Sequence, residues 1–177
     1  GPEANAPNTL QSTCGDGDLG VYHVDESLDW LKVSSVDALP LSAGKRARVE
    51  ARVWAYDGWS DDALDLFYTT TPDDPQWVWV ATLRPVRPGA QTLSAEYVLP
   101  PSGWQAIRGR YRYGGVAEAC GIVPGTPPAP QPYDDHDDLA FAVEYAPNAQ
   151  HDADLDAPSC AGVTAFCDTG VLLGGRG

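Results

Sequence analysis

The stretch KRARVEARVWAY, residues 45–56, decides the fold class. From residue 46 onward, its small apolar residues occupy the odd positions, and its charged and aromatic residues occupy the even positions. Because side chains of a β-strand point alternately to the two faces of a sheet, this stretch predicts a strand with one buried face and one polar face. The residues of the polar face that we predict to contact a ligand are Arg48, Arg52, Trp54 and Tyr56.

Seven further stretches have β character, and turn sequences such as DGWSDD, TPDDP and LPPSG separate them. None shows a long 3.6-residue period. Strands at such short spacing predict an all-β protein, a jelly-roll-like β-sandwich of about eight strands with an irregular C-terminal tail, with a closed barrel as the alternative. The expected strands besides 45–56 are 20–24, 28–36, 63–71, 76–83, 91–99, 104–113 and 138–145.

The chain divides into two parts by composition. We predict that residues 1–145 form the sandwich module, and that residues 146–177 form a Cys-containing tail or a linker between repeats. The tripeptide Ala-Pro-Asn occurs at 6–8 and again at 146–148, each time before a Cys-containing segment. This repetition leaves a tandem array of like units open as an alternative.

Charge and cysteine usage limit the classes of protein. The chain of 177 residues carries 25 acidic and 11 basic side chains, a net charge of −14, which argues against nucleic-acid binding and favours cations. It contains no apolar run of about 18 residues, so we predict no membrane span. Its four cysteines form no C-x-x-C motif, and an even number fits two disulfides in a secreted protein, with four reduced thiols as the alternative.

Two acidic clusters predict a metal site. CGDGDLGVYHVDESLDW (14–30) precedes the first long strand, and DDHDD (134–138) precedes the last predicted strand. Oxygen-rich loops with glycine turns suit calcium, and the first and last strands of a jelly roll often lie side by side, which would bring the clusters together. The alternatives are solvated loop aspartates, or a transition metal held through His23 and His136. The predicted calcium ligands come from Asp16, Asp18, Asp25, Glu26, Asp134, Asp135, Asp137 and Asp138.

Catalytic motifs are missing from the sequence, whereas binding features are present. The chain has no G-x-S-x-G, H-E-x-x-H or phosphate-loop motif, so we predict that it is not an enzyme. Arginines alternate along 104–113, which adds Arg110 to the candidate ligand contacts. Aromatic side chains beside polar groups suit sugar rings or a partner protein. The alternative is that the arginines pair with Glu50, Glu96 and nearby aspartates, and that most tryptophans lie in the core.

Several motifs, taken in order, resemble a known module. GVYHVDESLDWLKV, AGKRARVEARVWAY, LDLFYTT, GAQTLSAEYVLP and YDDHDDLAFAV, within residues 7–145, resemble an accessory β-sandwich module of secreted bacterial proteins, notably extracellular peptidases of myxobacteria and related groups. The resemblance implies a non-catalytic module. It also implies a bridge between Cys14 and Cys120, which match the cysteine positions of the module. We predict a second bridge between Cys160 and Cys167.

The sequence therefore predicts a secreted, non-enzymatic, calcium-stabilised and disulfide-linked β-sandwich module for adhesion, targeting or assembly. Its expected partner is another protein, like copies of itself, or a surface glycan. Two alternatives remain open, a structural repeat subunit of an extracellular filament or surface array, and a carbohydrate-binding module.

Overall fold

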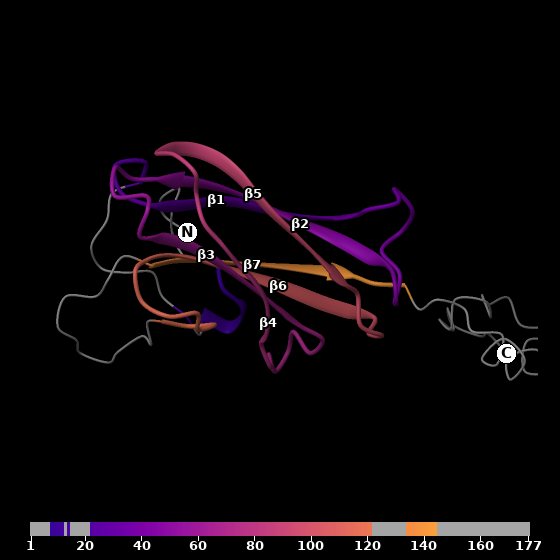
Figure 1. Cartoon of the computed structure of the whole chain (residues 1–177). Coiled ribbons are helices and arrows are strands. Elements are labelled where there is room, and N and C mark those ends of the chain that lie inside the picture. The colour runs from indigo at the N-terminus through magenta and orange to yellow at the C-terminus, as the bar shows by residue number, and fades with distance from the viewer. Residues whose placement is uncertain (1–7, 13, 15–21, 122–133, 145–177) are drawn as a thin grey trace, which may run out of the picture.

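A computed structural model of the chain describes residues 8–12, 14, 22–121 and 134–144. Within these residues, seven strands form two antiparallel sheets, so the chain is all-β and folds as a β-sandwich (Figure 1). A short 3-10 helix, η1 (Leu10–Ser12), precedes the strands. The strands are β1 (Ser27–Ser35), β2 (Arg46–Ala55), β3 (Asp62–Thr69), β4 (Val78–Leu83), β5 (Gly89–Val98), β6 (Trp104–Tyr113) and β7 (Asp134–Ala142).

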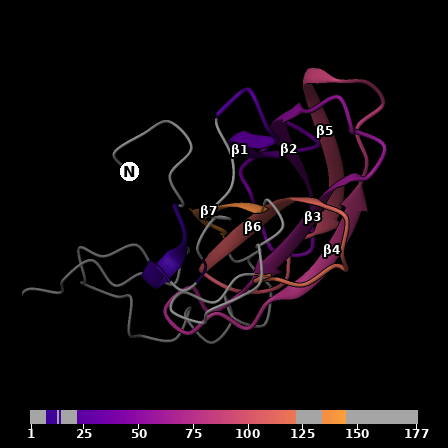
Figure 2. The same ribbon diagram turned by 90° about the vertical axis from the view of Figure 1, so that its left-hand side faces the viewer.

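The two sheets form separate layers. One sheet has the strand order β1-β2-β5, and the other has the order β4-β3-β6-β7. Figure 2 shows the two layers from a second direction. The chain passes from one sheet to the other after β2, after β4 and after β5. As a result, β5 pairs with β2 and β6 pairs with β3, although these strands are not consecutive in the sequence. No helix among the described residues is long and apolar enough to cross a membrane.

The core lies between the sheets, and β2 shows how the sequence selects it. The prediction of one buried face is confirmed, since the odd-numbered residues of β2 are buried and contact apolar residues of the opposite sheet. Packing is closest where β6 crosses β1. A Cβ atom on Gly109 would lie 2.7 Å from a methyl carbon of Leu28, a distance that real Cβ atoms essentially never show, so this position requires glycine. The buried side chains of β2 are Ala47, Val49, Ala51, Val53 and Ala55.

Two predicted strand boundaries were wrong. Residues 22–24 form a turn, so the expected first strand at 20–24 is not present in its described part. The last strand starts at Asp134 instead of 138, because β7 pairs with β6 along its whole length, from Asp134 opposite Arg112 to Ala142 opposite Trp104. The DDHDD cluster therefore lies within a strand and not in a loop before it.

The expectation that the first and last strands lie side by side is also corrected. β1 and β7 belong to different sheets, and they meet across the sandwich, where the Leu28 N–H donates a hydrogen bond of 2.6 Å to Asp135 Oδ2. The neighbour of β7 on its outer edge is the N-terminal segment. Asn8 forms a parallel bridge with Asp137, and the Leu10 N–H donates to Asp138 Oδ2 at 2.7 Å.

Candidate functional site

The outer face of β6 carries a row of three arginines. Because Ile107 and Tyr111 point into the core, the alternate residues of the strand point away from it. The three arginines are nevertheless almost completely buried, with exposed fractions of 1%, 5% and 4% for Arg108, Arg110 and Arg112. A buried guanidinium is costly unless an anion and further hydrogen-bond acceptors surround it.

Each arginine of the row has an aspartate partner. Two guanidinium nitrogens of every arginine donate to the carboxylate of one aspartate on a neighbouring strand, and these carboxylates are buried as well. The shortest nitrogen–oxygen distances are 2.7 Å for Arg108 with Asp138, 2.7 Å for Arg110 with Asp134, and 2.6 Å for Arg112 with Asp65.

The third nitrogen, Nη1, of every arginine holds the segment that follows β6. We call residues 114–120 the return loop, because this segment runs back along the outer face of β6. Five backbone carbonyls of the loop accept hydrogen bonds from the row. The donors and acceptors are Arg112 to Gly114 and Gly115, Arg110 to Val116 and Glu118, and Arg108 to Ala119.

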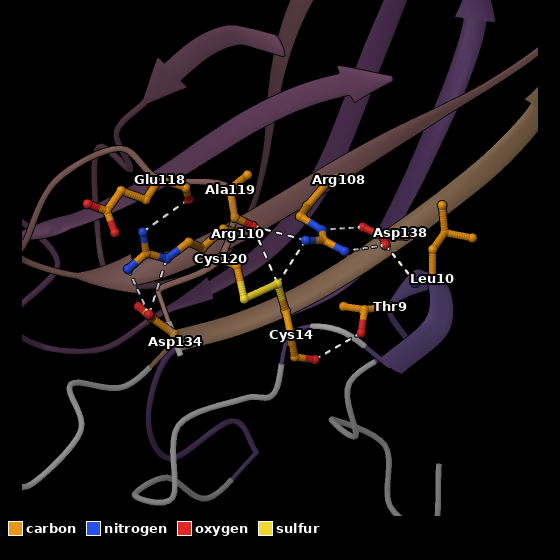
Figure 3. The surroundings of a disulfide bond; sticks show 10 residues. All are labelled: Thr9, Leu10, Cys14, Arg108, Arg110, Glu118, Ala119, Cys120, Asp134 and Asp138. Carbon is orange, nitrogen blue, oxygen red and sulfur yellow. Dashed lines mark hydrogen bonds and ion pairs between the residues drawn. A yellow bond between two sulfur atoms is a disulfide. The ribbon is translucent and has the colours of Figure 1, made fainter. Parts of the chain in front are cut away.

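A disulfide closes the end of the return loop. Cys14 and Cys120 are bonded, with their Cα atoms 5.6 Å apart, as the resemblance to the accessory module implied (Figure 3). Arg108 lies next to this bond, since its Nη1 donates to Cys14 Sγ at 2.8 Å, and its guanidinium stacks on the ring of Trp77 at 4.3 Å. The pair Cys160 and Cys167 lies outside the described residues.

These contacts explain how β7 tolerates four aspartates. Asp134 and Asp138 pair with arginines, while Asp135 and Asp137 accept hydrogen bonds from the Leu28 N–H and the Asn8 amide. The expectation that Arg110 is available to a ligand is corrected, because its guanidinium is buried beneath the return loop.

Calcium binding stays a prediction. Among the residues that the structure describes, no three His, Cys, Asp or Glu side chains gather as a metal-binding group. Asp16 and Asp18 lie outside the described residues, and Glu26 contacts Asp62, which the predicted ligand set did not include. Thermal melts with calcium, magnesium and a chelator test the prediction, since a calcium ion that binds only the folded state raises the melting temperature.

The outer face of β2 carries the other predicted ligand contacts. Arg48 and Arg46 both reach Glu96 of β5 at 2.8 Å, and Lys32 of β1 reaches Glu50 at 3.2 Å, so the alternative that these charges pair with each other is confirmed for this face. Arg52 has the longest of the contacts, 3.6 Å to Asp29. About half of its side chain, 47%, is exposed.

Next to Arg52, three rings form a stack at one end of the sandwich. The ring centroids of Tyr22 and His23 are 3.8 Å apart, those of His23 and Trp54 are 4.6 Å apart, and both ring pairs lie within 19° of parallel. Asp29 fixes the middle ring, since its Oδ1 lies 2.9 Å from His23 Nε2. His23 has φ of 58°, so the turn adopts a conformation unusual for a side-chain-bearing residue, which presents the ring to Trp54.

A shallow pocket opens at the same end. Its volume is about 240 Å³, and Glu26, Tyr56, Gly58 and Tyr113 line it. Glu26 directly precedes Ser27, the strand partner of Trp54, and Tyr56 lies two residues beyond Trp54. The pocket and the ring stack therefore belong to one region, which we call the aromatic end and define as Tyr22, His23, Glu26, Trp54, Tyr56 and Tyr113.

Beside the pocket, the carboxyl groups of Glu26 and Asp62 lie near each other, and each acts on the pKa of the other. Burial, and then the neighbouring Glu26, raise the pKa of Asp62 to about 7. Burial also raises the pKa of Glu26, with Asp25 adding to the effect. The Tyr111 hydroxyl donates to Asp62 Oδ2 at 3.1 Å. Below neutral pH, Asp62 therefore holds a proton.

Sequence reasoning found part of this region and missed the rest. Trp54 and Tyr56 were predicted ligand contacts, and the structure brings them together with Tyr113 and Glu26. Asp62 was missed because it stands in the polar stretch DGWSDD, which looks like an ordinary turn. The one available signal was that an Asp at the start of an apolar strand, such as DALDLFYT, has little access to solvent.

Comparison with known proteins gives little. The chain matches no protein-family model and no curated protein. Among solved structures, it is similar to the crystal structure of the C-terminal domain of wzt, with a TM-score of 0.47 and 12% sequence identity over 68% of this chain and 74% of that chain. We derive neither the ligand nor the activity of this protein from that likeness.

Proposed function

We propose that this chain is a non-catalytic carbohydrate-binding module, and that the aromatic end holds the sugar. The observation that carries the proposal is the stack of Tyr22, His23 and Trp54, which Asp29 holds in place. A preformed aromatic surface loses little conformational entropy when a ligand binds to it. Tyr22, at one end of the stack, has 36% of its surface exposed to solvent.

Sugar recognition needs apolar faces beside polar groups. The C–H face of a sugar ring packs on aromatic rings, and its hydroxyls need donors and acceptors at the edge of that surface. The aromatic end supplies both kinds of group, because Arg52 and Asp29 border the stack and Glu26 lines the pocket beside it. Exposed loops at one end of a rigid sandwich are a common place for such sites.

The carboxyl pair supports binding and not hydrolysis. Glycosidases hold two carboxyls about 5 to 9.5 Å apart, with the scissile bond between them. Asp62 is instead fully buried, so its carboxyl group does not reach a substrate bound in the pocket. A disulfide suits a secreted protein. We therefore propose that this chain is a secreted module that binds its ligand without catalysis. Assembly through copies of the chain stays a prediction.

Glycan-array screening followed by calorimetry tests the proposal. Tyr22→Ala, which removes the exposed end of the stack, should lower the affinity for the selected oligosaccharide about tenfold and leave the melting temperature nearly unchanged. Trp104→Ala is the matched control, since Trp104 is also exposed but lies on β6 in the other sheet. Equal affinity in both variants, or no glycan bound in the screen, would overturn the proposal.

A further inference from the structure

The carboxyl pair at the aromatic end differs in one respect from the acids that pair with the arginine row. Asp65, Asp134 and Asp138 each have an arginine partner, but among the described residues neither Glu26 nor Asp62 forms an ion pair. The nearest arginine contact, from Arg84 Nη1, reaches only the backbone carbonyl of Asp62, at 3.3 Å. The pair therefore lacks the cation that the three acids beside the arginine row have.

The hydrogen bonds of Asp62 show where a cation would fit. Asp62 is fully buried, its Oδ2 accepts from Tyr111, and within the described part of the chain its Oδ1 has no hydrogen-bond donor. Glu26, whose carboxyl group acts on Asp62, lines the pocket. A cation in the pocket would thus meet Glu26 directly and offset the negative charge of the pair.

The walls of the pocket select the kind of cation. Tyr56 and Tyr113 stand on the lining with 45% and 46% of their surface exposed, and aromatic faces attract organic cations. Calcium requires six to eight oxygen ligands, while the lining contains a single carboxylate. An organic ammonium group, which needs one or two carboxylates and an aromatic wall, fits the pocket better.

We propose that the pocket binds the ammonium group of an amino saccharide whose sugar rings lie on the neighbouring ring stack. This inference rests on the proposed carbohydrate function and specifies the chemical class of its ligand. Asp25 and Asp61 act on the pair with the same sign of charge, and the chain as a whole carries a net charge of −14, so the surroundings attract a cationic sugar.

The test compares three oligosaccharides of equal length by calorimetry, under mildly acidic conditions in which the amine is protonated. They are a glucosamine oligomer, its N-acetylated form and a glucose oligomer. The free-amine oligomer should bind at least about tenfold more tightly than the other two. Glu26→Gln should abolish this preference, while Asp57→Asn, which removes an exposed acid near the pocket, should keep it.

The outcomes separate the inference from the function on which it rests. Equal affinity for the three oligosaccharides would overturn the ammonium site and leave the carbohydrate function intact. Binding of ethylammonium, lost in Glu26→Gln, together with no binding of any oligosaccharide would overturn the carbohydrate function and support the ammonium site. Displacement of the free-amine oligomer by calcium, but not by sodium at equal ionic strength, would overturn the proposal in favour of a metal site.

Discussion

Buried acids are neutralised in two different ways in this sandwich. Beneath the return loop, arginines neutralise them, whereas at the aromatic end the raised pKa of Asp62 lets a proton do so. Burial raises the pKa of Asp134 as well, but there Arg110 and Arg112 act against the increase, while no positive group acts against it at Asp62. Acid-rich clusters need a defined counter-charge. Where arginine side chains supply it, the region has a fixed structure, and where a proton supplies it, a cationic ligand can take the place of the proton.

The largest expected effect concerns the disulfide that closes the arginine-paired region. Replacing Cys14 and Cys120 by Ser removes a crosslink between residues 106 apart in sequence, and should lower the free energy of unfolding by roughly 4–5 kcal/mol in the chain-entropy model. Denaturant unfolding of the wild type and the double variant, both without reductant, measures the change. A free energy of unfolding equal to that of the wild type would show that the arginine row alone holds the return loop.

Next in size is the loss of one arginine from the row. Arg110→Met leaves Asp134 as a buried charge without its partner, which typically costs about 3–5 kcal/mol. Adding Asp134→Leu should recover most of the stability, because the pair is then replaced by apolar side chains. The double-mutant cycle in urea gives the coupling energy of the pair. Additive losses from the two substitutions would contradict the claim that the arginine neutralises this aspartate.

A smaller effect is expected from the carboxyl pair of Glu26 and Asp62. Because folding raises the pKa of Asp62 from 3.8 to about 7, the folded state binds more protons than the unfolded state, and the stability falls as the pH rises between these values. From pH 5 to pH 7, the loss should be about 2–3 kcal/mol.

Asp62→Asn should remove this pH dependence, while Asp61→Asn, which changes an exposed neighbour, should preserve it. Chemical denaturation at several pH values gives the difference between wild type and each variant. The comparison of the two regions breaks down if the wild type and Asp62→Asn lose stability in parallel as the pH rises.

The smallest effect belongs to the exposed charges on the outer face of β2. Glu96→Gln breaks the contacts with Arg46 and Arg48, yet it should lower the free energy of unfolding only slightly, because the exposed partners stay solvated. This difference should shrink further at high salt. A loss as large as that of Arg110→Met would mean that burial does not determine the value of an ion pair in this protein.

The strand pattern could be predicted from the sequence because each strand carries its own signal. The alternation of 45–56 gave β2 within one residue at each end, since one buried face requires a period of two. The same rule failed at β7, where charged residues fill both faces and the alternation of apolar and polar residues disappears.

The contacts at the two sites could not be predicted from the sequence, because they depend on how strands pair with each other. Arg108, Arg110 and Arg112 recur with a period of two, but only the register of β6 against β7 and β3 shows that aspartates stand beside them. Likewise, Glu26 and Asp62 meet only because β1 and β3 start at the same end of the sandwich. A polar face was therefore predicted correctly for β2, where the charges remain exposed, and incorrectly for β6, where a later segment covers them.

The way in which the return loop is attached has a consequence for sequence change. The arginines bind its backbone carbonyls, and the side chains of Val116, Ala117 and Glu118 are exposed. Every residue type offers the same carbonyl, so substitutions at these three positions leave the attachment unchanged. Gly121 is the opposite case, because a side chain there would collide with Arg110 and Asp134. The loop thus combines a fixed backbone path with a surface on which new side chains can be displayed without reshaping the fold.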